Sequence, residues 1–115
     1  DFTSMAIAPS PDAYQEHVHP VVVEHPVTHR PTLYVNPVYT TRFDGWTPEE
    51  SRQLLEFLHR HSINENFTCR LRWSVHTLAI WDNRCTMHNA LNDYSGVRRE
   101  MFRTSVKGAE PRGVS

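Results

Sequence analysis

Residues 67–73 read Phe67-Thr68-Cys69-Arg70-Leu71-Arg72-Trp73, and apolar side chains in this stretch alternate with polar ones. Because successive side chains of a β-strand point to opposite faces, the alternation predicts a strand with one buried face. Residues 77–81 are more uniformly apolar, and residues 99–106 alternate again. The second half of the chain is therefore predicted to consist mainly of short strands.

Three more β-prone runs lie in the first half of the chain. Residues 21–23 are consecutive valines bounded by prolines, and residues 32–35 are a second run, which Asn36-Pro37 ends. The segment 26–31 between them predicts a hairpin-like connection. Residues 39–43 form the third run, and an Asp-Gly pair follows it.

A helix start is the clearest local signal. Thr47 is followed by Pro48 at the first helical position and Glu50 at the third, which predicts a reciprocal capping box. The helix is expected to end near His61. Its apolar stripe consists of Leu54, Leu55, Phe57 and Leu58.

These elements predict a mainly β fold with one helix. A jelly-roll-type β-sandwich fits, as do other small α+β folds. Residues 1–16 show no periodicity and are expected to be irregular, while glycine and proline in residues 109–115 predict a flexible tail. The first residue is Asp1 rather than methionine, which suggests either processing or a piece of a longer protein.

Bulk composition excludes some partners. The formal charge of -1 gives no electrostatic footprint for nucleic acid or for an anionic membrane. Only two cysteines are present, Cys69 and Cys85, and we interpret both as free thiols in a reducing compartment. No apolar run approaches the roughly 20 residues that span a bilayer, and no signal peptide is visible. A cytoplasmic, intracellular protein is therefore expected.

Three polar residues near the C-terminus are candidates for chemistry. His88 follows the predicted strand at 77–81, and Arg99 and Arg103 would share one face of the last predicted strand. A lone histidine after a strand is usually a loop or core residue, and arginines at a sheet edge are usually solvated. If that face were buried instead, two guanidinium groups would require anions such as a carboxylate or sulfonate.

Several segments, in order and with similar spacing, resemble the taurine catabolism dioxygenase family over residues 17–108. They are His19-Pro20-Val21-Val22, Leu33-Tyr34-Val35-Asn36-Pro37, Tyr39-Thr40-Thr41-Arg42, Trp81-Asp82-Asn83-Arg84-Cys85-Thr86-Met87-His88, Asn92-Asp93-Tyr94 and Arg98-Arg99-Glu100-Met101-Phe102-Arg103. The resemblance implies the C-terminal portion of a double-stranded β-helix, or jelly-roll, that holds iron(II) on two histidines and a carboxylate.

The resemblance also implies a role for each matching residue. His88 corresponds to the second histidine ligand of iron, and Arg99 to the arginine that binds the far carboxylate of 2-oxoglutarate. Arg103 corresponds to the arginine that holds the anionic head group of the substrate. Tyr39 falls where the taurine enzymes carry a phenylalanine in the substrate pocket. Asp82 is expected to support the site by hydrogen bonding rather than to bind iron.

The activity implied is that of a non-haem iron(II)/2-oxoglutarate-dependent dioxygenase. It would hydroxylate a small anionic substrate, first of all a sulfonate such as taurine, with a carboxylate or sulfate ester as alternatives. Its partners would be the substrate, 2-oxoglutarate and O2, without nucleic acid or membrane, and it could form a homo-oligomer. A different class of function also remains open: a truncated, non-catalytic remnant or binding module.

The chain departs from the family pattern in ways that bear on this choice. It contains no His-x-Asp motif, which supplies the other two iron ligands in the family, and His17-Val18-His19 is not a substitute. Val23-Glu24 replaces an arginine-threonine pair, and His29 stands where family members often have glycine. The scattered histidines at 17, 19, 25 and 29 are too irregularly spaced for a structural zinc site.

Overall fold

The computed structural model describes residues 16–91 and 96–114 of the chain. The chain divides into two compact units, which are considered separately. The larger unit comprises Val18–Met87 and Pro111–Ser115, and the smaller comprises Asp1–His17 and His88–Glu110. Of the segment expected to be irregular, residues 1–15 lie outside the described part of the chain.

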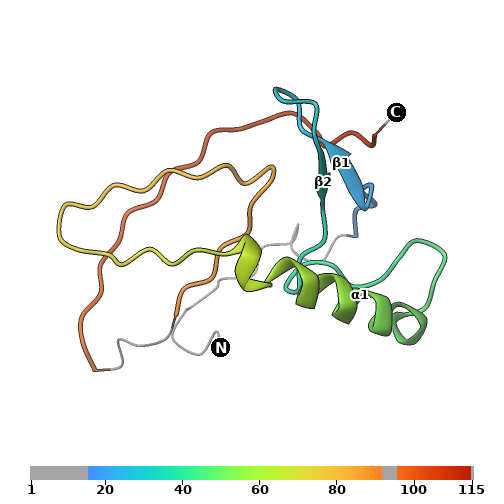
Figure 1. The fold of residues 1–115 in the computed structure, drawn as a ribbon, viewed down its shortest axis with the longest axis horizontal. Coiled ribbons are helices and arrows are strands. Elements are labelled where there is room, and N and C mark those ends of the chain that lie inside the picture. Colours follow the sequence, from blue (N-terminus) through green and yellow to red (C-terminus); the bar gives the residue numbers. More distant parts are fainter. Residues whose placement is uncertain (1–15, 92–95, 115) are drawn as a thin grey trace. The chain divides into compact units, whose positions relative to one another are not determined.

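An antiparallel hairpin organises the first half of the larger unit (Figure 1). Strand β1 (Val22–Glu24) pairs with β2 (Pro31–Leu33), with Val22 opposite Leu33 and Glu24 opposite Pro31. The hairpin predicted from the proline-bounded valine run is thus confirmed. Pro31 is tolerated because it is the first residue of its strand, where a missing N–H is least costly.

The last described residues also lie along β1. The Glu24 N–H donates to the Arg112 carbonyl oxygen at 2.9 Å, and Val23 forms an antiparallel bridge with Gly113. Val23 is therefore flanked on both sides and is only 4% exposed. Where the sequence predicts a flexible tail, residues 112–113 instead complete the edge of the hairpin, because β1 would otherwise present unpaired backbone groups.

Helix α1 (Pro48–Ser62) confirms the predicted helix and its capping box. The Thr47 hydroxyl accepts from the Glu50 N–H at 3.1 Å, and the Glu50 carboxylate accepts from the Thr47 N–H at 3.4 Å. Ser51 is fully buried, and its hydroxyl accepts from the Phe43 N–H at 3.0 Å. The start of the helix is thereby fixed to the preceding loop. A 3-10 turn, η2 (Glu65–Phe67), follows the helix.

Residues 39–43 do not form the expected strand. Asn36 and Thr40 satisfy the local backbone instead: the Val38 N–H donates to the Asn36 side chain at 2.8 Å, and the Asn36 N–H donates to the Thr40 hydroxyl at 2.9 Å. A third bond joins the Thr40 N–H to the Asn36 carbonyl oxygen at 2.9 Å. These bonds produce a turn, because short polar side chains compete with a neighbouring strand for backbone groups.

The strands expected at 67–73, 77–81 and 99–106 are also absent from the part of the chain that the structure describes. The described residues of these segments take part in no strand pairing, and large apolar side chains in them are exposed: Leu71 by 55%, Ile80 by 88% and Val106 by 97%. A strand requires both a paired backbone and a covered face. Over residues 16–91 and 96–114 the observed architecture is therefore a two-stranded sheet, one α-helix and a short 3-10 turn.

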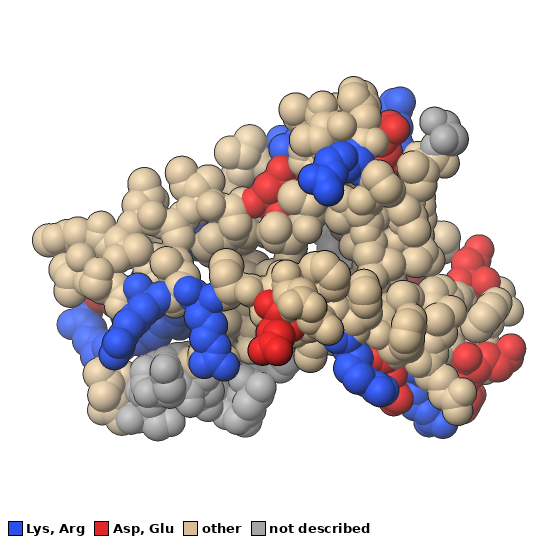
Figure 2. Space-filling model, in the orientation of Figure 1, with Lys and Arg blue, Asp and Glu red and all other residues tan. Residues whose placement is uncertain are grey.

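Few side chains are buried in the described residues. The buried hydrophobic residues are Val23, Val35 and Leu55. Figure 2 shows charged side chains of both signs on the viewed face, with broad uncharged areas between them. Cys69 and Cys85 are free, as expected, and both are exposed. Within residues 16–91 and 96–114, no helix has the length and apolar character needed to cross a membrane.

Candidate functional site

The predicted site residues fall into both units. His88, Arg99 and Arg103 belong to the smaller unit, and all three are exposed. Tyr39 and Asp82 belong to the larger unit. Tyr39 is 81% exposed in the turn at residues 37–39, whereas Asp82 is half-buried. The structure thus places the proposed ligands of iron, 2-oxoglutarate and substrate anion in one unit, and Asp82 in a separate polar cluster.

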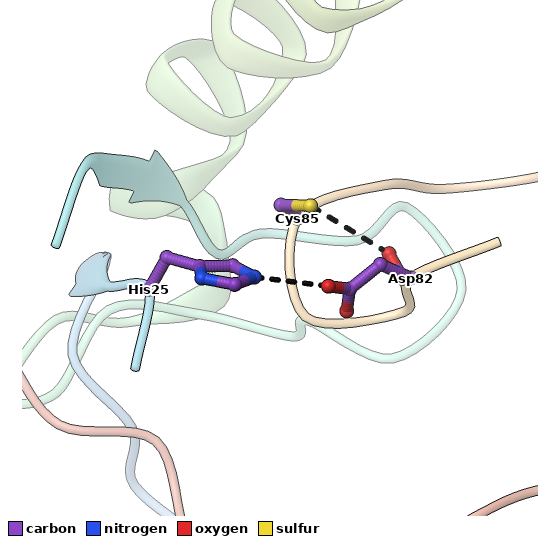
Figure 3. Close-up of side chains that lie close together, drawn as sticks. All are labelled: His25, Asp82 and Cys85. Atoms are coloured by element: carbon purple, nitrogen blue, oxygen red, sulfur yellow. Dashed lines mark hydrogen bonds and ion pairs between the residues drawn. The ribbon is translucent and has the colours of Figure 1, made fainter. Parts of the chain in front are cut away.

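Asp82, His25 and Cys85 form this cluster in the larger unit (Figure 3). Their potential ligand atoms all lie within 4.8 Å of one another, and no other group of three such residues occurs among the described residues. His25 comes from the connection after β1, whereas Asp82 and Cys85 come from a turn 57 or more residues later. The cluster therefore joins two segments that are distant in sequence.

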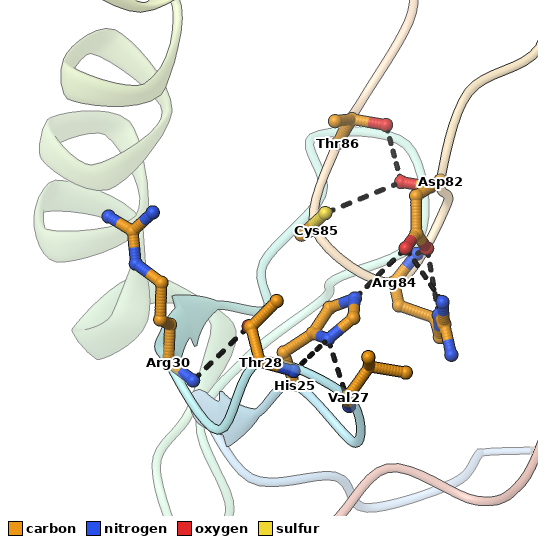
Figure 4. Close-up of polar contacts among 8 residues, drawn as sticks. All are labelled: His25, Val27, Thr28, Arg30, Asp82, Arg84, Cys85 and Thr86. Carbon is orange, nitrogen blue, oxygen red and sulfur yellow. Dashed lines mark hydrogen bonds and ion pairs between the residues drawn. The ribbon is translucent and has the colours of Figure 1, made fainter.

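Asp82 organises the turn in which it lies (Figure 4). Its carboxylate accepts from the Arg84 backbone N–H at 2.9 Å and from two guanidinium nitrogens of Arg84 at 2.9 and 2.8 Å. Its carbonyl oxygen accepts from the Thr86 hydroxyl at 2.6 Å and from the Thr86 N–H at 3.1 Å. Side chain and backbone together close residues 82–86 into one turn.

His25 is the partner of this turn in the hairpin. The residue is 7% exposed, and its Nε2 lies 2.9 Å from the Asp82 carboxylate. Its Nδ1 accepts from the backbone N–H groups of Val27 at 3.1 Å and Thr28 at 3.2 Å. Backbone N–H groups can only donate, so the proton of the ring is on Nε2 and points to Asp82. Sequence reasoning did not identify this pairing.

The same connection explains one departure from the family pattern. His29 donates its N–H to the His25 carbonyl oxygen at 2.9 Å, and its φ of 59° lies in the left-handed region. This conformation favours glycine, because a Cβ atom is crowded there. The glycine that the resemblance implies at this position would suit the turn, and His29 adopts the left-handed conformation in its place.

The hydrogen bonds argue against a metal in the cluster. Both ring nitrogens of His25 are engaged, one by backbone donors and one by Asp82. The Cys85 thiol donates to the Asp82 carbonyl oxygen at 3.8 Å. A metal would need an unprotonated histidine nitrogen and a thiolate, and binding would break these bonds. The cluster is better described as a hydrogen-bonded clamp, here called the His25–Asp82 clamp, which consists of His25, Asp82 and Arg84.

The charges in the clamp reinforce each other. Hydrogen bonds from Arg84, then from His25, hold the pKa of the Asp82 carboxyl far below its usual range. The same Asp82–Arg84 hydrogen bonds raise the pKa of the Arg84 guanidinium. Asp82 is therefore a carboxylate at every pH in which the protein would function.

We expect the ionised Asp82–Arg84 pair to stabilise the folded protein at pH values above the ordinary pKa of aspartate, and to lose this effect at lower pH. A folded-state pKa that is depressed contributes stability above the unfolded value of about 3.9 and loses it as the pH falls further. The difference in unfolding free energy between wild type and Asp82→Asn should be present at about pH 5 and shrink as the pH falls below about 4. Denaturant unfolding across that range measures it, and a difference that instead shrinks on raising the pH would contradict the assignment.

His88 can serve as one iron ligand, but the described residues do not complete a site around it. An imidazole is a suitable donor for iron(II), and the side chain is exposed. His88 is not part of any group of three possible metal ligands in the described chain. The chain contains no His-x-Asp motif to supply the others. The other histidine and the carboxylate of an iron triad would therefore have to come from outside this chain, which an experiment on the whole protein can test.

Comparison with known proteins finds one matching family and relatives whose names describe the same kind of enzyme. The family described as "Taurine catabolism dioxygenase TauD, TfdA family" matches residues 2–105. The alpha-ketoglutarate-dependent dioxygenase cnsM of Penicillium expansum is 49% identical over 88 residues, which cover 75% of this chain and 24% of that protein. The alpha-ketoglutarate-dependent sulfate ester dioxygenase of Pseudomonas putida is 35% identical over 96 residues, covering 84% and 32%.

A third relative is the putative alpha-ketoglutarate-dependent sulfonate dioxygenase of Schizosaccharomyces pombe. It is 34% identical over 94 residues, which cover 81% of this chain and 24% of that protein. The chain thus spans 24% to 32% of the length of these relatives. The family match, in contrast, extends over nearly all of the chain. The chain belongs to the taurine catabolism dioxygenase (TauD, TfdA) family.

Proposed function

We propose that the whole protein is a non-haem iron(II)/2-oxoglutarate-dependent dioxygenase and that this chain is its C-terminal part. The observation that carries the proposal is the family match over residues 2–105, a range that includes His88, Arg99 and Arg103. His88 would supply one imidazole ligand. The bound iron would supply the oxygen chemistry, while the residues of this chain bind and orient 2-oxoglutarate and the substrate.

Arg99 suits the task of holding 2-oxoglutarate. A guanidinium group presents two parallel N–H donors to a carboxylate, which fixes the orientation of the bound acid as well as its position. Arg103 lies four residues further on, and on an extended strand its side chain would point to the same face. Two anion-binding groups on one face allow a 2-oxo acid and an anionic substrate to be bound next to each other.

The fold proposed for the whole protein accounts for the exposed apolar residues. Segments 67–73, 77–81 and 99–106 keep a β-type pattern but have no strand partners among the described residues. In a complete jelly-roll, other strands would pair with them and cover side chains such as Ile80 and Phe102, which are 88% and 92% exposed. Arg99 and Arg103 lie on the opposite face of the proposed strand from Phe102, and where that face lines the interior of the jelly-roll their charges require anionic partners.

The proposed substrate is a small anion, with a sulfonate first and a sulfate ester or carboxylate as alternatives. Two relatives carry sulfonate and sulfate ester in their names, and Arg103 offers a guanidinium group that would bind either head group. Tyr39 would add a phenol hydroxyl to the pocket. That hydroxyl would offer the substrate a hydrogen-bonding partner that a phenylalanine lacks.

Turnover by the full-length protein tests this function. The protein would be incubated with Fe(II), O2 and 2-oxoglutarate, with taurine, an alkyl sulfate or a carboxylate of similar length as the candidate substrate. We expect succinate formation that one of these anions stimulates. A protein that binds neither Fe(II) nor 2-oxoglutarate would instead be the non-catalytic remnant or binding module.

Replacing Arg103 with alanine in that protein should separate substrate binding from 2-oxoglutarate binding. Losing a charged hydrogen-bond partner of the substrate costs about 2 kcal/mol or more, so the KM for the sulfonate should rise at least roughly 30-fold. Slow 2-oxoglutarate decay without substrate should persist. Arg103→Lys is the matched control, because lysine retains the positive charge but lacks the two parallel N–H donors of a guanidinium group. If Arg103→Ala abolished 2-oxoglutarate binding instead, Arg103 could not be the substrate residue.

A further inference from the structure

We propose that Arg112 and Gly113 form a closing segment that keeps the outer edge of β1 from pairing with a second copy of this chain. The inference goes beyond the proposed function and does not depend on it, because it concerns an edge of the hairpin and neither iron nor substrate. The residues that carry it all belong to the larger unit.

The outer edge of β1 is defined by the hydrogen bonds of the hairpin. The Val21 carbonyl oxygen accepts from the Tyr34 N–H at 2.6 Å, so the backbone groups of Val21 face β2. The backbone groups of successive residues in a strand point to opposite sides. The outer edge, which faces away from β2, therefore consists of the backbone groups of Val22 and Glu24.

The closing segment lies directly against this edge. The Glu24 N–H donates to the Arg112 carbonyl oxygen at 2.9 Å, and Gly113 forms an antiparallel bridge with Val23. A Cβ atom on Gly113 would lie 3.5 Å from the Pro20 side chain, which is ordinary van der Waals contact. Figure 1 shows the end of the chain, in red, beside β1. Without this segment the Glu24 N–H would lose its acceptor, and Val23, which is 4% exposed, would be uncovered.

The outer edge of β2 is protected in a different way. Strand β2 begins with Pro31, which has no N–H to donate to a neighbouring strand. A proline on an edge strand is one of the usual protections against pairing with another chain. Strand β1 contains no proline between Val22 and Glu24, so its outer edge depends on the closing segment for the same protection.

A second copy of the chain fits the outer edge of β1 because two identical edges in antiparallel pairing are self-complementary. With Val23 opposite Val23 of the second copy, Glu24 lies opposite Val22 of that copy. The Glu24 N–H then meets the Val22 carbonyl oxygen, and no like charges face each other. The closing segment uses the same N–H, so the two pairings exclude each other. Only three residues pair, so the association should depend on protein concentration.

The test uses variants of the full-length protein. Arg112→Pro combined with Val114→Pro, the proline pair, places two proline rings on the side that faces β1, because the Arg112 carbonyl oxygen faces that side and alternate residues share it. Arg112→Ala combined with Val114→Ala is the matched control, since it removes the same side chains but keeps both N–H groups. Adding Glu24→Pro to the proline pair removes the N–H from the outer edge and leaves the groups that face β2 in place.

The readout is the weight-average molar mass over a range of protein concentrations, and thermal unfolding checks that each variant is folded. We expect the molar mass of the proline pair to rise with concentration towards about twice the wild-type value. The alanine control should follow the wild type, and Glu24→Pro should suppress the rise. A folded proline pair that behaves like the wild type overturns the inference. Association that persists when Glu24→Pro is added also overturns it, because another surface would then be responsible.

If the proline pair does not fold, Arg112→Gly combined with Val114→Gly takes its place. Two glycines weaken the closing segment through the entropy of the unpaired chain and place no ring against β1. This variant must associate more than the wild type does, and equal association overturns the inference. A wild-type protein that binds neither Fe(II) nor 2-oxoglutarate would contradict the proposed function but would leave this result unaffected.

Discussion

Replacing His88 with alanine in the full-length protein should abolish turnover and weaken Fe(II) binding by more than about 100-fold. Changes in residues that merely orient a metal ligand cost about 10- to 100-fold in affinity, so the loss of a ligand itself should exceed that range. Fe(II) affinity would be measured by anaerobic equilibrium binding, and turnover by succinate formation. Without a tightly held metal, 2-oxoglutarate would also lose the partner that binds its keto acid end.

His76→Asn is the matched control for this experiment. His76 lies in a surface turn with a φ of 69°, and asparagine is among the few residues that tolerate this conformation. The substitution therefore removes an imidazole from the same half of the chain without disturbing its backbone. Fe(II) binding that falls equally in both variants, or that His88→Ala leaves at the wild-type level, would show that His88 is not a ligand.

The sequence predicted the helix and the hairpin because their determinants are local. The capping box needs only Thr47 and Glu50, three residues apart, and the structure shows both of its hydrogen bonds. The hairpin needs a β-branched run, a proline-bounded connection and a second run, all within residues 21–35. In the helix and in the hairpin, the residues that signal the element in the sequence lie close to the residues that form its hydrogen bonds.

The other strand predictions were wrong for the described chain. Alternation of apolar and polar residues indicates a buried face, but a strand also needs a neighbouring segment to pair with. Leu71 and Trp73 alternate with arginines as a half-buried strand requires, yet they are 55% and 40% exposed. The pattern indicates which face would be buried but not which segment would cover it. The run at 39–43 failed for a different reason, since Asn36 and Thr40 supply local partners that compete with pairing.

The candidate site shows the same division between local and long-range information. His88, Arg99 and Arg103 were identified by their matches to family motifs, which are linear in the sequence. Asp82 accepts hydrogen bonds from Arg84, which lies two residues away, and its expected role in supporting the iron site stays a prediction. Its bond to His25 crosses 57 residues, and no periodicity or spacing indicates such a contact.

Replacing Arg99 with glutamine should raise the KM for 2-oxoglutarate by roughly 30-fold or more. A guanidinium–carboxylate pair makes two charge-assisted hydrogen bonds, and removing one charged partner costs about 2 kcal/mol at least. Arg99→Lys should recover only part of the affinity, because an ammonium group retains the charge but not the planar fork. Succinate formation at varied 2-oxoglutarate concentrations measures the effect, which excess 2-oxoglutarate should largely reverse.

Arg98→Gln is a stringent control because it makes the same chemical change one residue away. Neighbouring side chains on an extended chain point to opposite sides, so Arg98 should not reach the acid that Arg99 binds. Arg98 forms an ion pair with Glu100, and both side chains are well exposed, so its loss should affect stability little. If Arg98→Gln raised the KM as much as Arg99→Gln, 2-oxoglutarate would be attracted by the positive charge of the segment as a whole and not bound by the guanidinium group of Arg99. If only Arg99→Gln raises the KM, the result supports a strand in which Arg99, and not Arg98, faces 2-oxoglutarate.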